Sequence, residues 1–177
     1  MSRQTFREQL WWSTTNGSAI ANTTTETILM PNVTIWANYM QAGRTVTADL
    51  WGKIAATSTP TMTFALRWGG VAGTILAQTA AITLAAVTDA IFHIAFNIQT
   101  RASGSSGSLL AFLEVNWGAT IKTTNTPDMG GSAGATVPAA VTVDLTADTA
   151  LALTAKWGTA NASNTITGMS YIGNSEN

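Results

Sequence analysis

The chain has 177 residues and no cysteine, and only 10% of its residues are charged, against 46% that are hydrophobic. A chain of this length can bury a full core without metal or disulfide support, and the lack of cysteine excludes thiolate catalysis and thiolate metal sites. The formal net charge of −1 gives no basic field for nucleic acid or anionic lipid. We therefore expect one ordered, soluble domain that binds neither nucleic acid nor a membrane.

The first 22 residues differ in character from the rest, because they set large aromatic side chains among charges and small polar residues. They lack the apolar run of a signal peptide. On a helix, Phe6 and Leu10 would share one face, but so short a helix is not stable alone. Aromatic side chains on a polar segment are typical of anchors that dock on a partner; the alternative is that Trp11 and Trp12 cover the domain's own core.

We therefore treat residues 1–22 as an N-terminal arm and residues 23–177 as the domain. The predicted partner-binding residues are Arg3, Phe6, Arg7, Leu10, Trp11 and Trp12.

Beyond the arm, apolar and polar side chains alternate. In residues 90–100, for example, Phe92 and Ile94 point one way while His93 points the other. Such a period of two predicts half-buried strands. The clear runs are residues 45–54, 61–68, 90–100, 108–117, 141–145 and 151–157, and weaker ones are residues 27–35, 74–84 and 165–172.

Turn signals rich in Gly, Pro, Ser and Asn separate these runs, for example at residues 103–107 and 158–164. Eight or nine short strands without a helical period predict an all-β fold, a single antiparallel β-sandwich of jelly-roll type. The longest irregular stretch covers residues 118–137. A loop of that length is usually functional or braced by a neighbour.

Four Trp-Gly dipeptides begin at Trp51, Trp68, Trp117 and Trp157. The last three end a predicted strand with the indole on its apolar face, so we expect them to close the core where glycine lets the chain turn. Their spacing is too uneven for the blades of a propeller.

Groups that could support catalysis are scarce. The single histidine, His93, lies on the polar face of a predicted strand, and the chain shows no Gly-x-Ser-x-Gly nucleophile elbow in a strand–turn–helix context. Glycosidases need two carboxylates about 5–10 Å apart. The candidates are Asp49, Asp89, Glu114, Asp128, Asp144 and Asp148.

Asp144 and Asp148 flank a predicted turn, where aspartates normally cap backbone amides. The pair could also hold Ca²⁺, although neither spacing nor number matches an EF-hand loop. We predict no catalytic residue, no cofactor and no metal site, and a protein that is not an enzyme.

Threonine, serine and alanine fill positions that charges would normally hold. Such a surface can be desolvated cheaply against another protein, which favours a chain that joins an assembly; the alternative is a stable monomer with a threonine-rich surface. Low net charge gives little repulsion between copies, and a closed oligomer would cover edge strands. We therefore expect self-association.

Three stretches carry a resemblance to known proteins: TSTPTMTFALRWGG followed by GTILAQTAAITL, IQTRASGSSGSLLAF, and VTVDLTADTALALTAKWGTANASNTIT. Through them, residues 21–172 resemble jelly-roll β-sandwich proteins encoded among bacteriophage structural genes, of the capsid-decoration, head-fibre or tail-associated type. Such proteins are often trimeric, so the resemblance implies a homotrimeric virion protein, assembled in the host cytoplasm, that contacts the major capsid protein or another virion protein. It implies no catalytic residue.

Two binding functions remain open. The first is a non-enzymatic accessory protein that decorates or cements a capsid, or caps another virion assembly. The second is a receptor-binding module that recognises host sugars through exposed aromatic residues such as Trp36, Trp51 or Tyr39. A glycan array with Trp→Ala variants would separate them, because the first function predicts no specific sugar.

Overall fold

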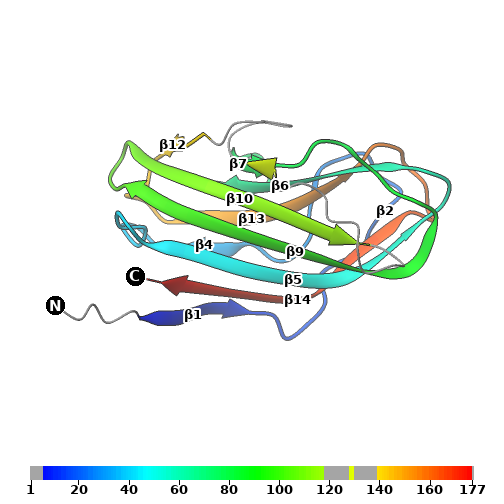
Figure 1. Ribbon diagram of the computed structural model, residues 1–177, viewed down its shortest axis with the longest axis horizontal. Helices are drawn as coiled ribbons and strands as arrows, with labels where there is room; N and C mark the ends of the chain where they lie inside the picture. Colours follow the sequence, from blue (N-terminus) through cyan, green and yellow to red (C-terminus); the bar gives the residue numbers. More distant parts are fainter. Residues whose placement is uncertain (1–5, 118–127, 130–138, 177) are drawn as a thin grey trace.

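The computed structural model of the protein describes residues 6–117, 128–129 and 139–176. This part of the chain forms fourteen strands in two antiparallel sheets that pack face to face (Figure 1). It contains no helix, and so none that could cross a membrane. The expected all-β antiparallel sandwich is confirmed.

The larger sheet has eight strands in the order β1-β14-β5-β9-β10-β11, with β2 beside β14 and β12 beside β10. Its strands are β1 Arg7–Trp12, β2 Ile20–Ala21, β5 Thr45–Ala56, β9 Val87–Ala102, β10 Gly107–Trp117, β11 Asp128–Met129, β12 Val141–Val143 and β14 Thr165–Glu176.

The smaller sheet has six strands in the order β3-β13-β6-β7, with β4 beside β13 and β8 beside β6. Its strands are β3 Thr27–Ile28, β4 Val33–Ile35, β6 Thr61–Trp68, β7 Thr74–Gln78, β8 Ile82–Thr83 and β13 Thr149–Trp157.

The long strands are nested in pairs. β5 lies beside β14 in the larger sheet, while β6, which follows β5, lies beside β13, which precedes β14, in the smaller sheet. The chain thus rolls up as a paired ribbon that crosses twice between the layers, which is the jelly-roll arrangement.

Every predicted run contains a strand, although residues 27–35 and 74–84 are each interrupted and form two short strands. Eight of the fourteen strands have five residues or more, and the other six have two or three. The predicted loop at residues 118–137 falls outside the described residues except for the short strand β11, which pairs with β10. The alternation of apolar side chains therefore located the main strands.

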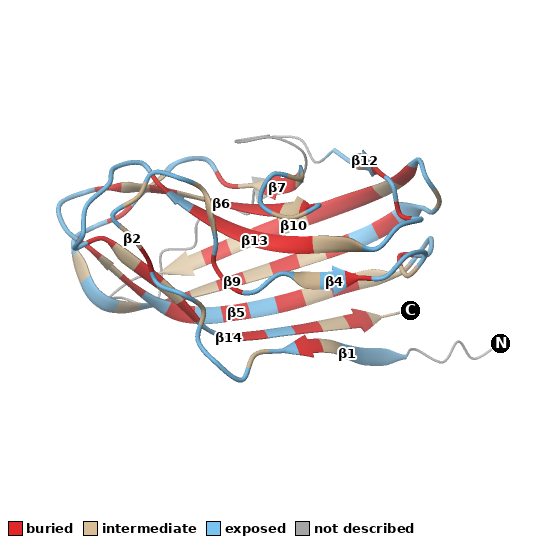
Figure 2. Ribbon diagram, turned by 180° about the vertical axis from the view of Figure 1, so that it is seen from behind, coloured by how far each residue is buried: buried red, intermediate tan, exposed pale blue. Residues whose placement is uncertain are grey.

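Burial follows the predicted alternation, as the colours along β5 and β9 show (Figure 2). Apolar side chains such as Leu50 and Ile94 fill the space between the sheets. Trp68 and Trp157 close this core as expected, and their indole Nε1 groups donate hydrogen bonds to backbone carbonyls. Trp51, in the middle of β5, points outward.

The N-terminal segment is extended and belongs to the larger sheet, so the helical arrangement of Phe6 and Leu10 does not occur. β1 pairs with β14, so the first and the last strand lie side by side (Figure 1). A β-bulge between Gln9 and Trp11 shifts the alternation, so that Trp11 points into the core and Trp12 points outward. The alternative in which both tryptophans cover the core therefore holds for Trp11 alone.

The core side of β14 is shaped to accept Trp11. Gly173 is its partner across the strands, and a Cβ at that position would lie 2.1 Å from ring atoms of Trp11. The Trp11 ring also tilts against Tyr171, with ring centroids 5.5 Å apart. Ser13 extends the pairing by hydrogen bonds with the backbone of Tyr171. These contacts anchor the segment to the domain.

Candidate functional site

Exposed apolar side chains gather on the outer face of the larger sheet. Of the nine large hydrophobic side chains that are exposed in the described part of the chain, five come from its strands: Trp12, Trp51, Ile91, Met169 and Ile172. Trp12 and Ile172 are direct cross-strand partners, and Met169 sits in a bulge of β14. We call Trp12, Met169 and Ile172 the edge patch. Apolar patches of this kind mark interaction sites.

The residues predicted to bind a partner are divided between core and surface. Leu10 packs against the core and Trp11 is buried in it, whereas Phe6 and Trp12 are exposed. Arg7 is exposed and lies 3.6 Å from Glu176. Arg3 lies outside the described residues. The sequence did not reveal Met169 and Ile172, because Ile172 becomes the partner of Trp12 only through the pairing of β1 with β14, and Met169 is exposed by a bulge of β14.

A second group of side chains, the aromatic cluster, comprises Asp49, Trp51 and His93. The rings of Trp51 and His93 stack with centroids 4.1 Å apart and planes 21° apart. His93 Nε2 lies 2.8 Å from Asp49 Oδ1. The carboxylate thus holds the imidazole, and the imidazole holds one face of the Trp51 ring, which remains 49% exposed.

Within the described part of the chain, the strands beside His93 do not supply the neighbours of a catalytic triad. A triad histidine needs a hydroxyl nucleophile on the nitrogen that does not face the acid. The direct cross-strand neighbours of His93 are Trp51 and Asn116. Ser170 lies two strands away, opposite Trp51, at about 10 Å by the spacing of strands. His93 is on the outer, polar side of its strand, as predicted.

A shallow depression of about 250 Å³ adjoins the aromatic cluster on β5, β9 and β10. Its small centre is Ala95, which has Asp49 on one side and Glu114 on the other across the strands. The other lining residues are Thr47, Ala48, Phe96, Asn97 and Phe112. Glu114 also accepts a hydrogen bond of 2.9 Å from the Asn116 side chain. The depression therefore combines two carboxylates, an amide and a hydroxyl with the Phe112 ring.

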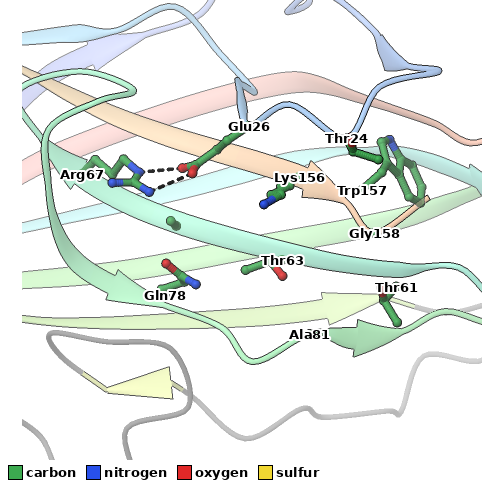
Figure 3. A pocket seen from close by; sticks show the side chains of 11 residues that line it. Thr24, Glu26, Thr61, Thr63, Arg67, Gln78, Ala81, Lys156, Trp157 and Gly158 are labelled. Carbon is green, nitrogen blue, oxygen red and sulfur yellow. Dashed lines mark hydrogen bonds and ion pairs between the residues drawn. The ribbon is translucent and has the colours of Figure 1, made fainter. Parts of the chain in front are cut away.

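The smaller sheet carries a different feature on its outer face, a groove of about 680 Å³ (Figure 3). Thr61 and Thr63 of β6 line it, with Lys156 on one side and Gln78 on the other. The remaining lining residues are Thr24, Glu26, Ala65, Arg67, Ala81, Trp157 and Gly158. The Trp157 ring is fully buried, so the groove offers hydroxyls, an amide and charge but no exposed aromatic ring.

Glu26 and Arg67 form a bidentate ion pair at one end of the groove, with distances of 2.6 and 2.7 Å. Arg67 also donates to the Gly73 carbonyl, and the Thr154 hydroxyl donates to Glu26. Burial alone would raise the pKa of Glu26, but the hydrogen bonds from Arg67 and Thr154, with the nearby positive charges, hold it below its usual value. These contacts tie the segment before β3 and the turn at Gly73 to β6.

Three further candidate carboxylates, Asp89, Asp144 and Asp148, are engaged in local contacts, and the side chain of Asp128 lies outside the described part of the structure. Asp144 accepts hydrogen bonds from the amide and hydroxyl of Thr146, which lower its pKa. Asp148 accepts one from the Ala37 amide. The predicted capping role of this turn is confirmed. Asp89 lies 3.0 Å from Lys53, and the described residues contain no group of three or more His, Asp or Glu side chains that could hold a metal.

The three aromatic residues considered for sugar binding lie in different surroundings. Tyr39 is partly buried, with its hydroxyl on Glu8 and the Arg44 guanidinium 4.2 Å from the ring centre. Trp36 is 62% exposed on the loop after β4. Trp51 lies on the same face of β5 as Asp49, which lines the polar depression. The sequence placed Asp49 and His93 on outward positions, but the register that brings both to Trp51 could not be read from it.

No protein-family model matches the chain, and no curated protein matches it. Among the solved structures that are similar to it at low levels are a plant lectin and a viral particle. A peanut lectin with a nine-residue peptide is 9% identical, with 98% of each chain covered and a TM-score of 0.37. The VP2 subviral particle of infectious bursal disease virus is 11% identical, with 98% of this chain and 41% of that chain covered and a TM-score of 0.22. Similarities this weak carry no conclusion about function.

Proposed function

We propose that this protein is a non-enzymatic structural protein of a bacteriophage virion that assembles with further copies of itself through the edge patch. The patch carries the proposal. Its Trp12 side chain is 63% exposed beside Ile172, on the terminal strand of the larger sheet as the described residues form it. A docked aromatic side chain buries roughly 150–250 Å², so at about 25 cal/mol per Å² the patch supplies several kcal/mol before ordering costs.

A second copy of the chain is the occupant that fits this surface. The nearby charges are paired within the chain, Arg7 with Glu176, so a partner needs no complementary charge. A chain with 10% charged residues and a net charge of −1 is such a partner. A closed ring of copies would also cover the exposed edge of β1, which would otherwise be a site for unwanted strand pairing.

The virion setting and the number of copies are supported by the sequence resemblance. It covers residues 21–172 and points to decoration, head-fibre or tail-associated proteins, which are often trimers. The assembled protein would then lie on the major capsid protein or another virion protein.

Sedimentation equilibrium tests the self-association. We expect the intact protein at about three times the chain mass of 18.5 kDa, and Trp12→Ser at a lower mass. Trp36→Ser is the matched control, because Trp36 is equally exposed but outside the patch. A constant mass of 18.5 kDa at all concentrations, or equal dissociation by the two variants, would contradict the proposal.

Particle binding tests the virion function. Purified protein should rebind to phage particles from which it has been stripped, and Trp12→Ser should rebind less at the same concentration. If Trp36→Ser weakens rebinding as much as Trp12→Ser does, the edge patch does not contact the particle.

The absence of enzymatic activity is proposed from the neighbours of His93 and from the capping roles of Asp144 and Asp148. A screen with ester and glycan substrates should show no turnover. Hydrolysis by the intact protein that is lost in His93→Ala or Glu114→Gln would contradict this part of the proposal.

A further inference from the structure

The part of the larger sheet formed by β5, β9 and β10 is chemically distinct from the edge patch on β1 and β14. Three rungs of cross-strand neighbours follow one another there: Thr47 with Asn97 and Phe112, Asp49 with Ala95 and Glu114, and Trp51 with His93 and Asn116. The small side chain of Ala95, at the centre of the middle rung, creates the depression, and the rung on one side adds Phe112 to its lining. The rung on the other side holds Trp51, which follows the lining residue Asp49 on the same face of β5.

Trp51 has the properties of a binding platform. Exposed side chains usually change rotamer within nanoseconds. The Trp51 ring is instead stacked on His93, which is itself largely buried and hydrogen-bonded to Asp49. The preorganised ring offers its free surface to a ligand at little additional ordering cost. An aromatic surface of this kind binds an apolar ligand face such as the C–H face of a sugar ring.

The polar groups beside Trp51 define the rest of the ligand. Asp49 and Glu114 accept hydrogen bonds, while Asn97 and Thr47 can both donate and accept. Acceptors therefore predominate, and two of them are carboxylates. They favour a ligand rich in hydroxyl donors, and their charge disfavours phosphates and acidic sugars.

We propose that Trp51 and the adjoining depression form a binding site for a neutral saccharide. One sugar ring stacks on Trp51, and the hydroxyls of the next ring bind Asp49, Asn97 and Glu114. The volume of about 250 Å³ lies just below the range of pockets for small ligands, so the site takes one or two rings. This function goes beyond self-association, because the residues of the edge patch take no part in it.

Binding is tested first by presenting the intact protein to an array of neutral and acidic glycans. The neutral set contains glucose, galactose, mannose and N-acetylglucosamine as monomers and short oligomers, and the acidic set contains glucuronate and N-acetylneuraminate. We expect binding in the neutral set with a Kd of about 0.1–10 mM for one or two rings by calorimetry. No binding of neutral glycans, or a preference for acidic ones, would overturn the proposal.

Variants then locate the site. Trp51→Ala should weaken binding at least about tenfold, and the isosteric Glu114→Gln by about threefold or more. Trp36→Ala should leave binding unchanged, because Trp36 is exposed on a loop without the depression. Lys156→Gln, in the groove of the smaller sheet, should do likewise. Equal losses from Trp51→Ala and Trp36→Ala, or full binding by both Trp51→Ala and Glu114→Gln, would overturn the assignment.

Sedimentation of the same variants keeps the two proposals apart. Trp51→Ala should retain the mass of the intact oligomer while losing the sugar, whereas Trp12→Ser should lose mass and retain sugar binding. If Trp51→Ala dissociates the oligomer and the intact protein binds no glycan, the aromatic cluster belongs to a protein interface and the saccharide site is refuted.

Discussion

The outer faces of the two sheets arise from the same alternation of side chains but present different chemistry. On the larger sheet, Trp12 and Trp51 are exposed beside charges that lie at the surface, such as Lys53 and Asp89. On the smaller sheet, threonines and Gln78 line a polar groove that ends in the shielded pair of Glu26 and Arg67. The outer face of the larger sheet offers apolar area to a partner. On the smaller sheet, the charged side chains instead bind segments of the same chain, since Arg67 contacts Glu26 and the Gly73 carbonyl.

The ion pairs show why the two faces differ in function. The Lys53 and Asp89 side chains are 49% and 61% exposed, whereas those of Arg67 and Glu26 are 15% and 23% exposed. Exposed pairs contribute little to stability, so a partner can disturb them at low cost. A shielded bidentate pair contributes more, and losing one member leaves the other charge unpaired. We infer that recognition belongs to the larger sheet and structural support to the smaller one.

The largest predicted effect separates the two adjacent tryptophans of β1, which face opposite sides of the larger sheet. Trp11→Ala should lower the free energy of unfolding by about 3–5 kcal/mol, because it leaves a cavity against Gly173 and Tyr171. Trp12→Ala should change it by about 0.5 kcal/mol or less. Urea denaturation at one low protein concentration measures both. Similar losses for the two variants would mean that the outer side of β1 is packed as tightly as the core side.

The next prediction compares the two ion pairs directly. Glu26→Gln should cost about 1–3 kcal/mol at pH 7, because an amide group would then face the Arg67 guanidinium. Asp89→Asn, on the other face, should cost about 0.5 kcal/mol or less. Asparagine also tolerates the left-handed backbone at this position, where φ is 50°, which makes it a suitable control. Equal losses in urea denaturation would remove the contrast between the faces.

Acid should reduce the effect of Glu26→Gln on the free energy of unfolding. The folded-state pKa of Glu26 lies below its usual value, so the charged carboxylate stabilises the fold at neutral pH. That contribution is lost as the pH falls through the folded-state pKa. The difference between the intact protein and Glu26→Gln should therefore be full at pH 7 and shrink below about pH 4. A difference that stays constant down to pH 2.5 would show that the charge of Glu26 is not what stabilises the pair.

The strands were predictable because their alternation is local. Leu50, Ile94 and their neighbours alternate with polar residues for as long as each strand lasts, and burial in the structure follows that pattern. β1 escaped prediction because a bulge between Gln9 and Trp11 breaks the period. A sequence contains no local sign of where such an extra residue is inserted.

The candidate site was predictable only in part, for a similar reason. The alternation placed Asp49 and His93 outward, but only the register between β5 and β9 sets His93 against Trp51. Likewise, Ala95 is an ordinary small residue until the register places it between Asp49 and Glu114. The register depends on contacts between distant parts of the chain, so the depression and the edge patch could be found only in the folded structure.

The smallest effect is expected outside both faces, at the turn that begins with Asp144. This carboxylate is fully exposed, and its pKa is lowered by hydrogen bonds from the side chain and amide of Thr146. Asp144→Asn keeps an acceptor oxygen for Thr146 and removes only the charge. At pH 7, the midpoint of thermal unfolding should therefore fall less in Asp144→Asn than in Glu26→Gln. The midpoints of Asp144→Asn and the intact protein should converge as acid protonates Asp144. Circular dichroism melting curves at pH 7 and pH 3 measure both differences. A loss at pH 7 as large as that of Glu26→Gln would show that an exposed turn carboxylate stabilises the fold as much as the shielded pair, and would contradict the assignment of structural support to the smaller sheet.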